Sequence, residues 1–271
     1  ELPEGYEPYV GGHILAYDMA SGQVKDLATA PPAEGIITFN VDAQRGRMYG
    51  LTWPGGRFLV YDMERGTLED RGPVSRGGEG GRGEEYFCLC RAFAIDPRDG
   101  AVYMTNPDGQ VLRHRPGEQT MQPVQGLSLR RDILGCWDPH KPGHQGFNWR
   151  DISWHAEEKV FYGVHPKSGW LFRFDPPAER IELIERIAAE PLQRSGRWEP
   201  FRYGYLTLRI GPDRRTLYYL TGVYDLVGDD GRAVPTGMHL VTYNLDTRQR
   251  TDHGVLRLGD GRYPVQCQTL A

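Results

Sequence analysis

Apolar and polar residues alternate along most of the chain. Residues 36–53 read IITFNVDAQRGRMYGLTW, and the apolar stretch FLVYD follows at 58–62. A period of two is typical of strands with one buried face. The turns DAQRG at 42–46 and DMERG at 62–66 contain Asp and Gly and favour tight hairpins. The pattern therefore predicts an all-β protein of short antiparallel strands with helical content near zero.

The same arrangement of strands and turns recurs. Tyr49 and Tyr103 are 54 positions apart, and so are Asp42 and Asp96. Four antiparallel strands per unit, repeated around an axis, define the blades of a β-propeller, and a period of 40 to 50 residues is typical of such repeats. The four predicted units cover residues 36–74, 90–124, 148–187 and, with an insertion, 205–256.

The two ends of the chain read as parts of a further unit. Residues 11–27 match the second half of a blade, and residues 262–271, RYPVQCQTLA, match a first strand. We predict one propeller domain over residues 1–271, with about five blades if these end strands close the ring. The alternative is a fragment of a six- or seven-bladed propeller. The start at Glu1 without Met predicts a processed or trimmed N-terminus.

Composition narrows the classes of function. The net charge is −4 and no basic stripe is present, which argues against nucleic acid as a partner. No apolar run approaches the roughly 18 residues of a membrane helix, and no signal peptide is visible. The four cysteines fit no CxxC zinc pattern and leave the redox compartment open.

The long insertions are predicted to share one face of the propeller. In a blade, the connections that leave the second and the outermost strand emerge on the same face, and the other face receives tight turns. Long loops on a rigid scaffold usually carry binding or chemistry, although shielding of the channel mouth is the alternative. The insertions are residues 75–86, 126–146, 190–203 and 222–237.

Arg91 and Arg150 occupy an unusual position in the repeat. Aligned on the units, they fall on the innermost strand where the other two units have Ile37 and Leu206. A buried unpaired charge is costly, so these arginines predict either an ion pair or an anion in the channel mouth. The planar guanidinium fork suits a carboxylate. Acids considered for an internal pair are Glu34, Glu85 and Asp151.

Residues 136–151, CWDPHKPGHQGFNWRD, form the densest polar and aromatic cluster. His140 and His144 have the spacing of a metal-binding pair on a helix, but Pro139 and Pro142 exclude a helix, so no metal site is assigned. A surface loop with solvated histidines is the alternative interpretation. The same cluster supplies Trp137, Asn148 and Trp149.

Further histidines are predicted at the rim of the loop-rich face. The simpler interpretation is that each is a half-exposed rim residue without a part in binding or catalysis. Histidine exchanges protons near neutral pH. The candidate catalytic residues are His140, His144, His165, His239 and Tyr205. The candidate substrate-binding residues are Arg91, Arg150, Asn148, Trp137, Trp149, Trp170, Glu34 and His13.

The stretch YGLTWPGGRFLVYDMERGTLEDRG at 49–72 resembles blades of bacterial propellers of the SMP-30/gluconolactonase and streptogramin lyase groups, and of propeller-type polysaccharide lyases. The lactonase resemblance implies a divalent cation held by acidic and Asn side chains, which Glu34 and Asn148 match. The lyase resemblance implies His, Tyr and Arg around a uronate. There, Arg neutralises the carboxylate, a base removes the α-proton, and the bond at C4 breaks by β-elimination.

Together these observations predict a secreted or periplasmic enzyme that cleaves an acidic, uronate-containing oligo- or polysaccharide as a lyase. The tryptophans would stack on sugar rings. One alternative is a non-catalytic propeller that binds a glycan or a protein. The other is a metal-dependent, lactonase-like hydrolase.

Overall fold

The computed structural model describes residues 9–75, 77–79, 89–134, 146–166, 168–195, 207–227 and 233–264. Almost all regular structure in these residues is β. The helical elements there are the short helix α1 (Glu190–Ser195) and a 3-10 turn at Asp132–Leu134, slightly more helix than the sequence predicts. None of the described helices has the length and apolar character needed to cross a membrane.

The strands form four four-stranded antiparallel sheets and one two-stranded sheet. The N-terminal pair is β1 (His13–Tyr17) and β2 (Val24–Thr29). The next sheet comprises β3 (Gly35–Asp42), β4 (Arg47–Trp53), β5 (Arg57–Asp62) and β6 (Thr67–Pro73). It is followed by β7 (Ala94–Ile95), β8 (Val102–Thr105), β9 (Gln110–His114) and β10 (Gln122–Ser128).

Two more sheets complete the described strands. One comprises β11 (Asp151–His155), β12 (Val160–Val164), β13 (Trp170–Asp175) and β14 (Arg180–Arg186). The other comprises β15 (Thr207–Ile210), β16 (Thr216–Val227), β17 (Ala233–Asn244) and β18 (Arg250–Val255). In every sheet the strands pair in chain order, as the repeat predicts.

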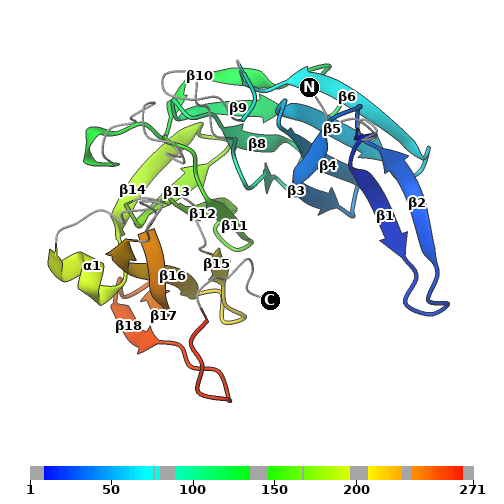
Figure 1. Cartoon of the computed structure of the whole chain (residues 1–271). Coiled ribbons are helices and arrows are strands. Elements are labelled where there is room, and N and C mark those ends of the chain that lie inside the picture. Colours follow the sequence, from blue (N-terminus) through cyan, green and yellow to red (C-terminus); the bar gives the residue numbers. More distant parts are fainter. Residues whose placement is uncertain are drawn as a thin grey trace.

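The sheets follow one another around an arc, with β1–β2 at one end and β15–β18 at the other (Figure 1). The first strand of each complete sheet lies innermost, because β11 contacts both β7 and β15. The outermost strands also meet, β2 with β6 and β10 with β14. This radial order of four-stranded units confirms the propeller prediction, with five sheets in all.

The predicted closure of the ring stays a prediction. Most of the strand expected at residues 262–271 lies outside the described residues. Among the residues that the structure does describe, β1 and β2 pair only with each other.

The tight turns form because side chains replace missing backbone partners. Asp62 accepts hydrogen bonds at Oδ1 from the backbone amides of Glu64 and Arg65, both at 3.0 Å. The bond from the Arg65 amide is the main reason why the pKa of Asp62 lies below its ordinary value. Gly66 closes the turn with a φ of 66°, a conformation that favours glycine. The sequence DMERG therefore forms a tight hairpin turn between β5 and β6.

The core lies between neighbouring sheets. Phe58 meets Phe93 of the next sheet edge-on at 5.8 Å, and Tyr103 meets Phe174 in the same way at 5.1 Å. Such aromatic pairs add about 0.5–1.5 kcal/mol each beyond the burial of their area. Sheet-to-sheet packing of this kind fixes the inner strands relative to one another, and those strands carry the candidate site.

Candidate functional site

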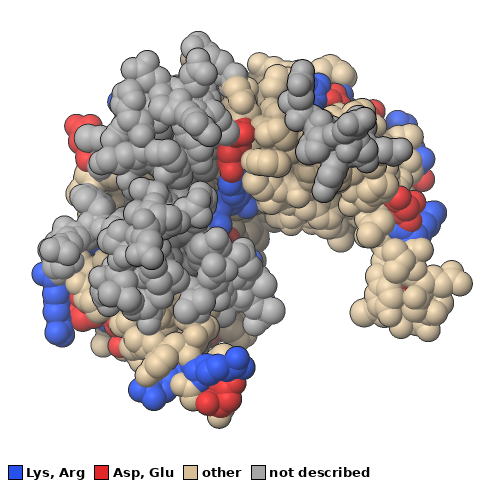
Figure 2. All heavy atoms as spheres, in the orientation of Figure 1, with Lys and Arg blue, Asp and Glu red and all other residues tan. Residues whose placement is uncertain are grey.

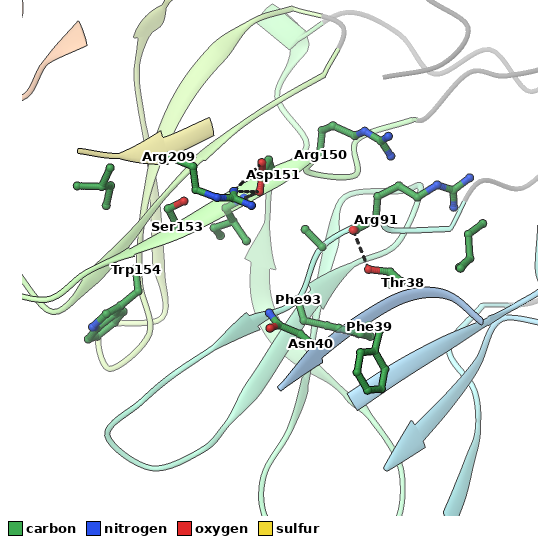
Figure 3. A pocket seen from close by; sticks show the side chains of 14 residues that line it. Thr38, Phe39, Asn40, Arg91, Phe93, Arg150, Asp151, Ser153, Trp154 and Arg209 are labelled. Atoms are coloured by element: carbon green, nitrogen blue, oxygen red, sulfur yellow. Dashed lines mark hydrogen bonds and ion pairs between the residues drawn. The ribbon is translucent and has the colours of Figure 1, made fainter. Parts of the chain in front are cut away.

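The inner strands enclose a cavity of about 620 Å³, here called the central cavity (Figure 3). Its walls come from four successive sheets, so no single unit of the repeat could form it. Three arginines and one aspartate provide its charged groups. The lining residues are Ile37 to Asn40 of β3, Arg91 to Phe93 before β7, Arg150 to Trp154 at β11, and Arg209 and Ile210 of β15.

Arg91 and Arg150 both line this cavity. Both side chains extend in the same direction, away from Phe39 and Trp154 (Figure 3). Their shared position in the repeat therefore does bring them together, as the sequence predicts. Figure 2 shows basic and acidic side chains meeting in the hollow between the two arms of the arc.

Arg91 is held by an acid that sequence reasoning missed. Its Nη2 forms an ion pair with Glu79 Oε1 at 2.5 Å, and its Nη1 donates to the Leu89 carbonyl at 3.0 Å. The backbone carbonyl of Arg91 accepts from Thr38 Oγ1 at 2.9 Å, which ties it to β3. Glu79 lies in the Gly-rich insertion, where no periodic pattern indicates which side chain turns inwards.

Asp151 joins β11 to β15. Its Oδ2 accepts from Thr207 Oγ1, the Leu208 amide and Arg209 Nη1, each at 2.9 Å. A carboxylate oxygen that accepts from three donors of this kind holds its partners firmly. Asp151 thus pairs with Arg209 rather than with its neighbour Arg150. Sequence reasoning missed Arg209, whose signal was a charged residue inside the inner strand TLRI.

His165 has a structural place between two loops. It is fully buried between β12 and β13, and it lines no part of the central cavity. Its Nδ1 lies 2.8 Å from Ser168 Oγ, and its Nε2 lies 3.2 Å from the Gly146 carbonyl. These contacts hold the loop that precedes β13 against Gly146 and Phe147. Its proposed part in proton transfer stays a prediction.

The prediction that Trp149 offers a stacking surface to sugars is wrong. The ring is fully buried, stacks on Phe172 at 6.1 Å, and donates from Nε1 to the Ala92 carbonyl at 2.9 Å. Neither ring face can meet a ligand without unfolding the core. Asn148 beside it is also buried, whereas Trp170 is half-buried and packs against the core.

Two further candidates lie away from the central cavity. Both carboxylate oxygens of Glu34 accept from the Gly55 amide, at 3.1 and 2.9 Å, so this side chain holds the turn between β4 and β5. His13 lies on β1 at the end of the arc, with Nδ1 2.5 Å from Asp26 Oδ2 (Figure 1). His140, His144, Trp137 and Tyr205 lie outside the described residues.

His239 lines a different, open cavity of about 950 Å³ beside α1 and β18. Its Nδ1 lies 3.0 Å from both carboxylate oxygens of Asp252. Burial acts to raise the pKa of Asp252, but bonds from the Glu190 and Gly254 amides and from His239 outweigh it, so the pKa lies below its ordinary value. His239 therefore belongs to a hydrogen-bonded pair with Asp252 outside the central cavity.

The Asp252 carboxylate is expected to stabilise the fold at neutral pH. Asp252→Asn should lower the free energy of unfolding at pH 7 by about 1–2 kcal/mol, because charge-assisted hydrogen bonds are lost. A carboxyl with a lowered pKa contributes stability above its unfolded pKa, near 3.8, and loses it as the pH falls through the folded pKa. The difference from wild type should therefore shrink between pH 7 and pH 3. Urea unfolding at both pH values measures it.

The exposed Asp246 provides the matched control, since Asp246→Asn removes the same charge with little expected cost. An Asp252→Asn penalty that is equal at pH 7 and pH 3 would contradict the role given to the carboxylate.

Metal ligands are not gathered in the described part of the chain. No group of three or more His, Cys, Asp or Glu residues there has the arrangement to hold a metal ion. The one described cysteine, Cys90, is a buried free thiol that lies 3.2 Å from the Ala92 carbonyl. Glu34 and Asn148, which match the lactonase resemblance, do not form such a group among the described residues.

The fold and the central cavity define the class: this is a β-propeller with a polar cavity at its inner strands. No protein-family model matches the sequence, and neither does any curated protein. Solved structures do match. A putative 6-phosphogluconolactonase from Bacteroides uniformis is 15% identical, with a TM-score of 0.53, over 92% of this chain and 68% of that chain.

A second putative 6-phosphogluconolactonase, from Bacteroides fragilis, is 12% identical with a TM-score of 0.54, over 92% of this chain and 65% of that chain. A GH74 enzyme from Niastella koreensis is 11% identical with a TM-score of 0.54, over 90% of this chain and 34% of that chain. The chain thus spans about two thirds of the first two and one third of the third. At such identities the likeness shows the propeller fold alone.

Proposed function

We propose that this protein is a carbohydrate-active propeller whose central cavity binds the carboxylate of a uronate-containing oligo- or polysaccharide. The observation that carries the proposal is the parallel placement of Arg91 and Arg150 on one cavity (Figure 3). Guanidinium groups bind carboxylates through paired N–H donors. A volume of about 620 Å³ lies within the usual range for small-ligand sites.

The lining of the central cavity offers groups that suit an acidic saccharide. Arg91, Arg150 and Arg209 are cationic side chains that can meet its carboxylates. Thr38, Asn40 and Ser153 add polar side chains that suit sugar hydroxyls, and Phe39 is an exposed aromatic ring at the same cavity.

The reaction proposed at this site is β-elimination. A base takes the proton from C5, the carbon that bears the carboxylate, and the electrons of that C–H bond form a double bond between C4 and C5. The C4–O bond breaks, its electrons leave with the oxygen of the departing sugar, and that oxygen takes up a proton from an acid or from water. The arginines would stabilise the charge that develops on the carboxylate. The base is proposed among His140, His144 and Tyr205. Similar structures include a putative 6-phosphogluconolactonase and a GH74 enzyme, and a carbohydrate-related function agrees with these names.

The test combines turnover with binding on polygalacturonate, alginate and hyaluronate. Elimination creates a double bond conjugated with the carboxylate, so ultraviolet absorbance should rise with time. Calorimetric titration of the same polymers measures binding without turnover. Binding with no rise in absorbance, with and without added Ca²⁺, would overturn the lyase assignment and leave a glycan-binding propeller. Neither binding nor absorbance with any of the three polymers would overturn the whole proposal.

A further inference from the structure

A second enclosed site lies on the face of the tight turns, far from the long insertions. Between the sheets β3–β6 and β7–β10 there is a cavity of about 390 Å³, here called the turn-side cavity. Its rim includes Arg45 of the β3–β4 turn, Arg65 of the β5–β6 turn, and Gly117 of the β9–β10 turn. The residues that matter below are Arg45, Arg47, Tyr49, Arg65, Arg71 and His114.

His114 differs in type from the residues at the same strand position in the two sheets that follow. It pairs with Val102, the residue before Tyr103. At the same register, the next sheet has Phe174 opposite Phe161, and the last sheet has Tyr243 opposite Leu217. Phe174 meets Tyr103 of the preceding sheet, and Tyr243 shares a core cluster with Tyr162 of its preceding sheet. The repeat therefore accepts an apolar ring here, and packing alone does not require a histidine.

The His114 ring leaves one acceptor unused. Its Nε2 lies 2.9 Å from the Glu118 carbonyl and must donate the proton there. Burial is the main reason why the pKa of His114 lies below its ordinary value, so the ring is neutral at pH 7 and Nδ1 carries a lone pair. The side chain is 3% exposed, and Nδ1 has no hydrogen-bond partner among the described residues. A buried acceptor of this kind costs free energy unless a donor reaches it.

Arg71 supplies the complementary group on the same cavity. Its Nη1 donates to Gln119 Oε1 at 2.8 Å, and its Nη2 pairs with Glu69. Its Nε–H is buried and has no acceptor within the described part of the chain. The turn-side cavity thus presents one unused acceptor and one unused donor, which a ligand with a hydroxyl and an anionic oxygen would satisfy together.

The charges around these two groups favour an anion. Arg47 pairs with Asp62 at 3.0 Å, and Arg45 pairs with Asp42 at 3.1 Å. Four arginines line the cavity, and they outnumber the three carboxylates that pair with them, Asp42, Asp62 and Glu69. An acidic ligand therefore gains attraction that a neutral one does not.

We propose that the turn-side cavity binds a sugar acid of monosaccharide size, with its carboxylate toward the arginines and a hydroxyl donating to His114 Nδ1. The volume suits a ligand of this size. The ring of Tyr49 lies at 6.5 Å from the His114 ring and closes one wall. The site is separate from the central cavity, so its existence does not depend on the function proposed above.

The test is calorimetric titration of the whole chain with D-gluconate, sorbitol and acetate. Gluconate carries both features, sorbitol lacks the carboxylate, and acetate lacks the hydroxyls. We expect gluconate to bind at least about tenfold more tightly than either comparator, a difference of ~1.4 kcal/mol. Equal affinity for sorbitol and gluconate, or no heat with gluconate at tens of millimolar, would overturn the proposal.

Variants test whether gluconate binds in the turn-side cavity. His114→Phe copies the ring that Phe174 supplies in the next sheet and should weaken gluconate about tenfold or more. Arg71→Gln should do the same and carries the test if His114→Phe does not fold. Arg215→Gln removes an exposed arginine that lines neither cavity and should leave gluconate affinity unchanged. Wild-type affinity in both turn-side variants, or an equal loss in Arg215→Gln, would contradict the assignment.

Discussion

Trp149→Ala is expected to lower the free energy of unfolding by about 3–5 kcal/mol. The side chain is fully buried against Phe172 and Phe174, at ring distances of 6.1 and 6.0 Å. Its removal would leave a cavity between two sheets and take the indole N–H donor away from the Ala92 carbonyl. Urea or thermal unfolding of the purified chain measures the loss.

Tyr17→Ala provides the matched control, because Tyr17 is an aromatic residue with 64% exposure on β1. Its replacement should change the stability by no more than about 0.5 kcal/mol. Unchanged stability in Trp149→Ala together with lost saccharide binding would instead restore the stacking surface that the sequence suggested.

Arg150→Gln is expected to weaken binding of a galacturonate trisaccharide by about 10- to 100-fold. The variant keeps a polar, though shorter, side chain and removes the charge that would meet the uronate carboxylate. A charge-assisted hydrogen bond is worth about 1.5–3 kcal/mol, which gives a change of this size. Arg150 is preferred to Arg91 for this test because loss of Arg91 would also strand Glu79, which is largely buried.

The control for Arg150→Gln is Arg215→Gln. Arg215 is 68% exposed and pairs with Asp246 in a turn, outside the residues that line the central cavity. It changes the net charge equally, so it reports any non-specific electrostatic effect. Equal weakening by both variants would show that overall charge, not the central cavity, governs binding.

Much of the fold could be read from the sequence because its signals are local. The strand period and the DMERG-type turns are each encoded within a few neighbouring residues. The 54-residue separation of Tyr49 and Tyr103 shows that the same unit is repeated. The same regularity placed Arg91 and Arg150 together. Once a repeat is aligned, equivalent residues must lie at equivalent points of neighbouring sheets, and the structure confirms this at the central cavity.

The sequence does not predict which side chains pair with the arginines of the central cavity. Glu79 lies in a Gly-rich insertion, and Trp149 precedes the first residue of β11, so strand alternation says nothing of the direction of either side chain. The pairing of Asp151 with Arg209 joins two sheets and depends on how they pack. Nothing in the sequence distinguishes His114, because its unused Nδ1 and the aromatic rings at the same register of neighbouring sheets become visible only in the folded chain.

The most direct test of the central cavity is a calorimetric comparison of trigalacturonate with its methyl ester. The two ligands share rings and hydroxyls and differ only in the carboxylate charge. For the wild-type chain we predict that the acid binds at least about tenfold more tightly than the ester, and that Arg150→Gln abolishes this difference. Equal affinity of the wild type for acid and ester would contradict a carboxylate-binding role for Arg91 and Arg150.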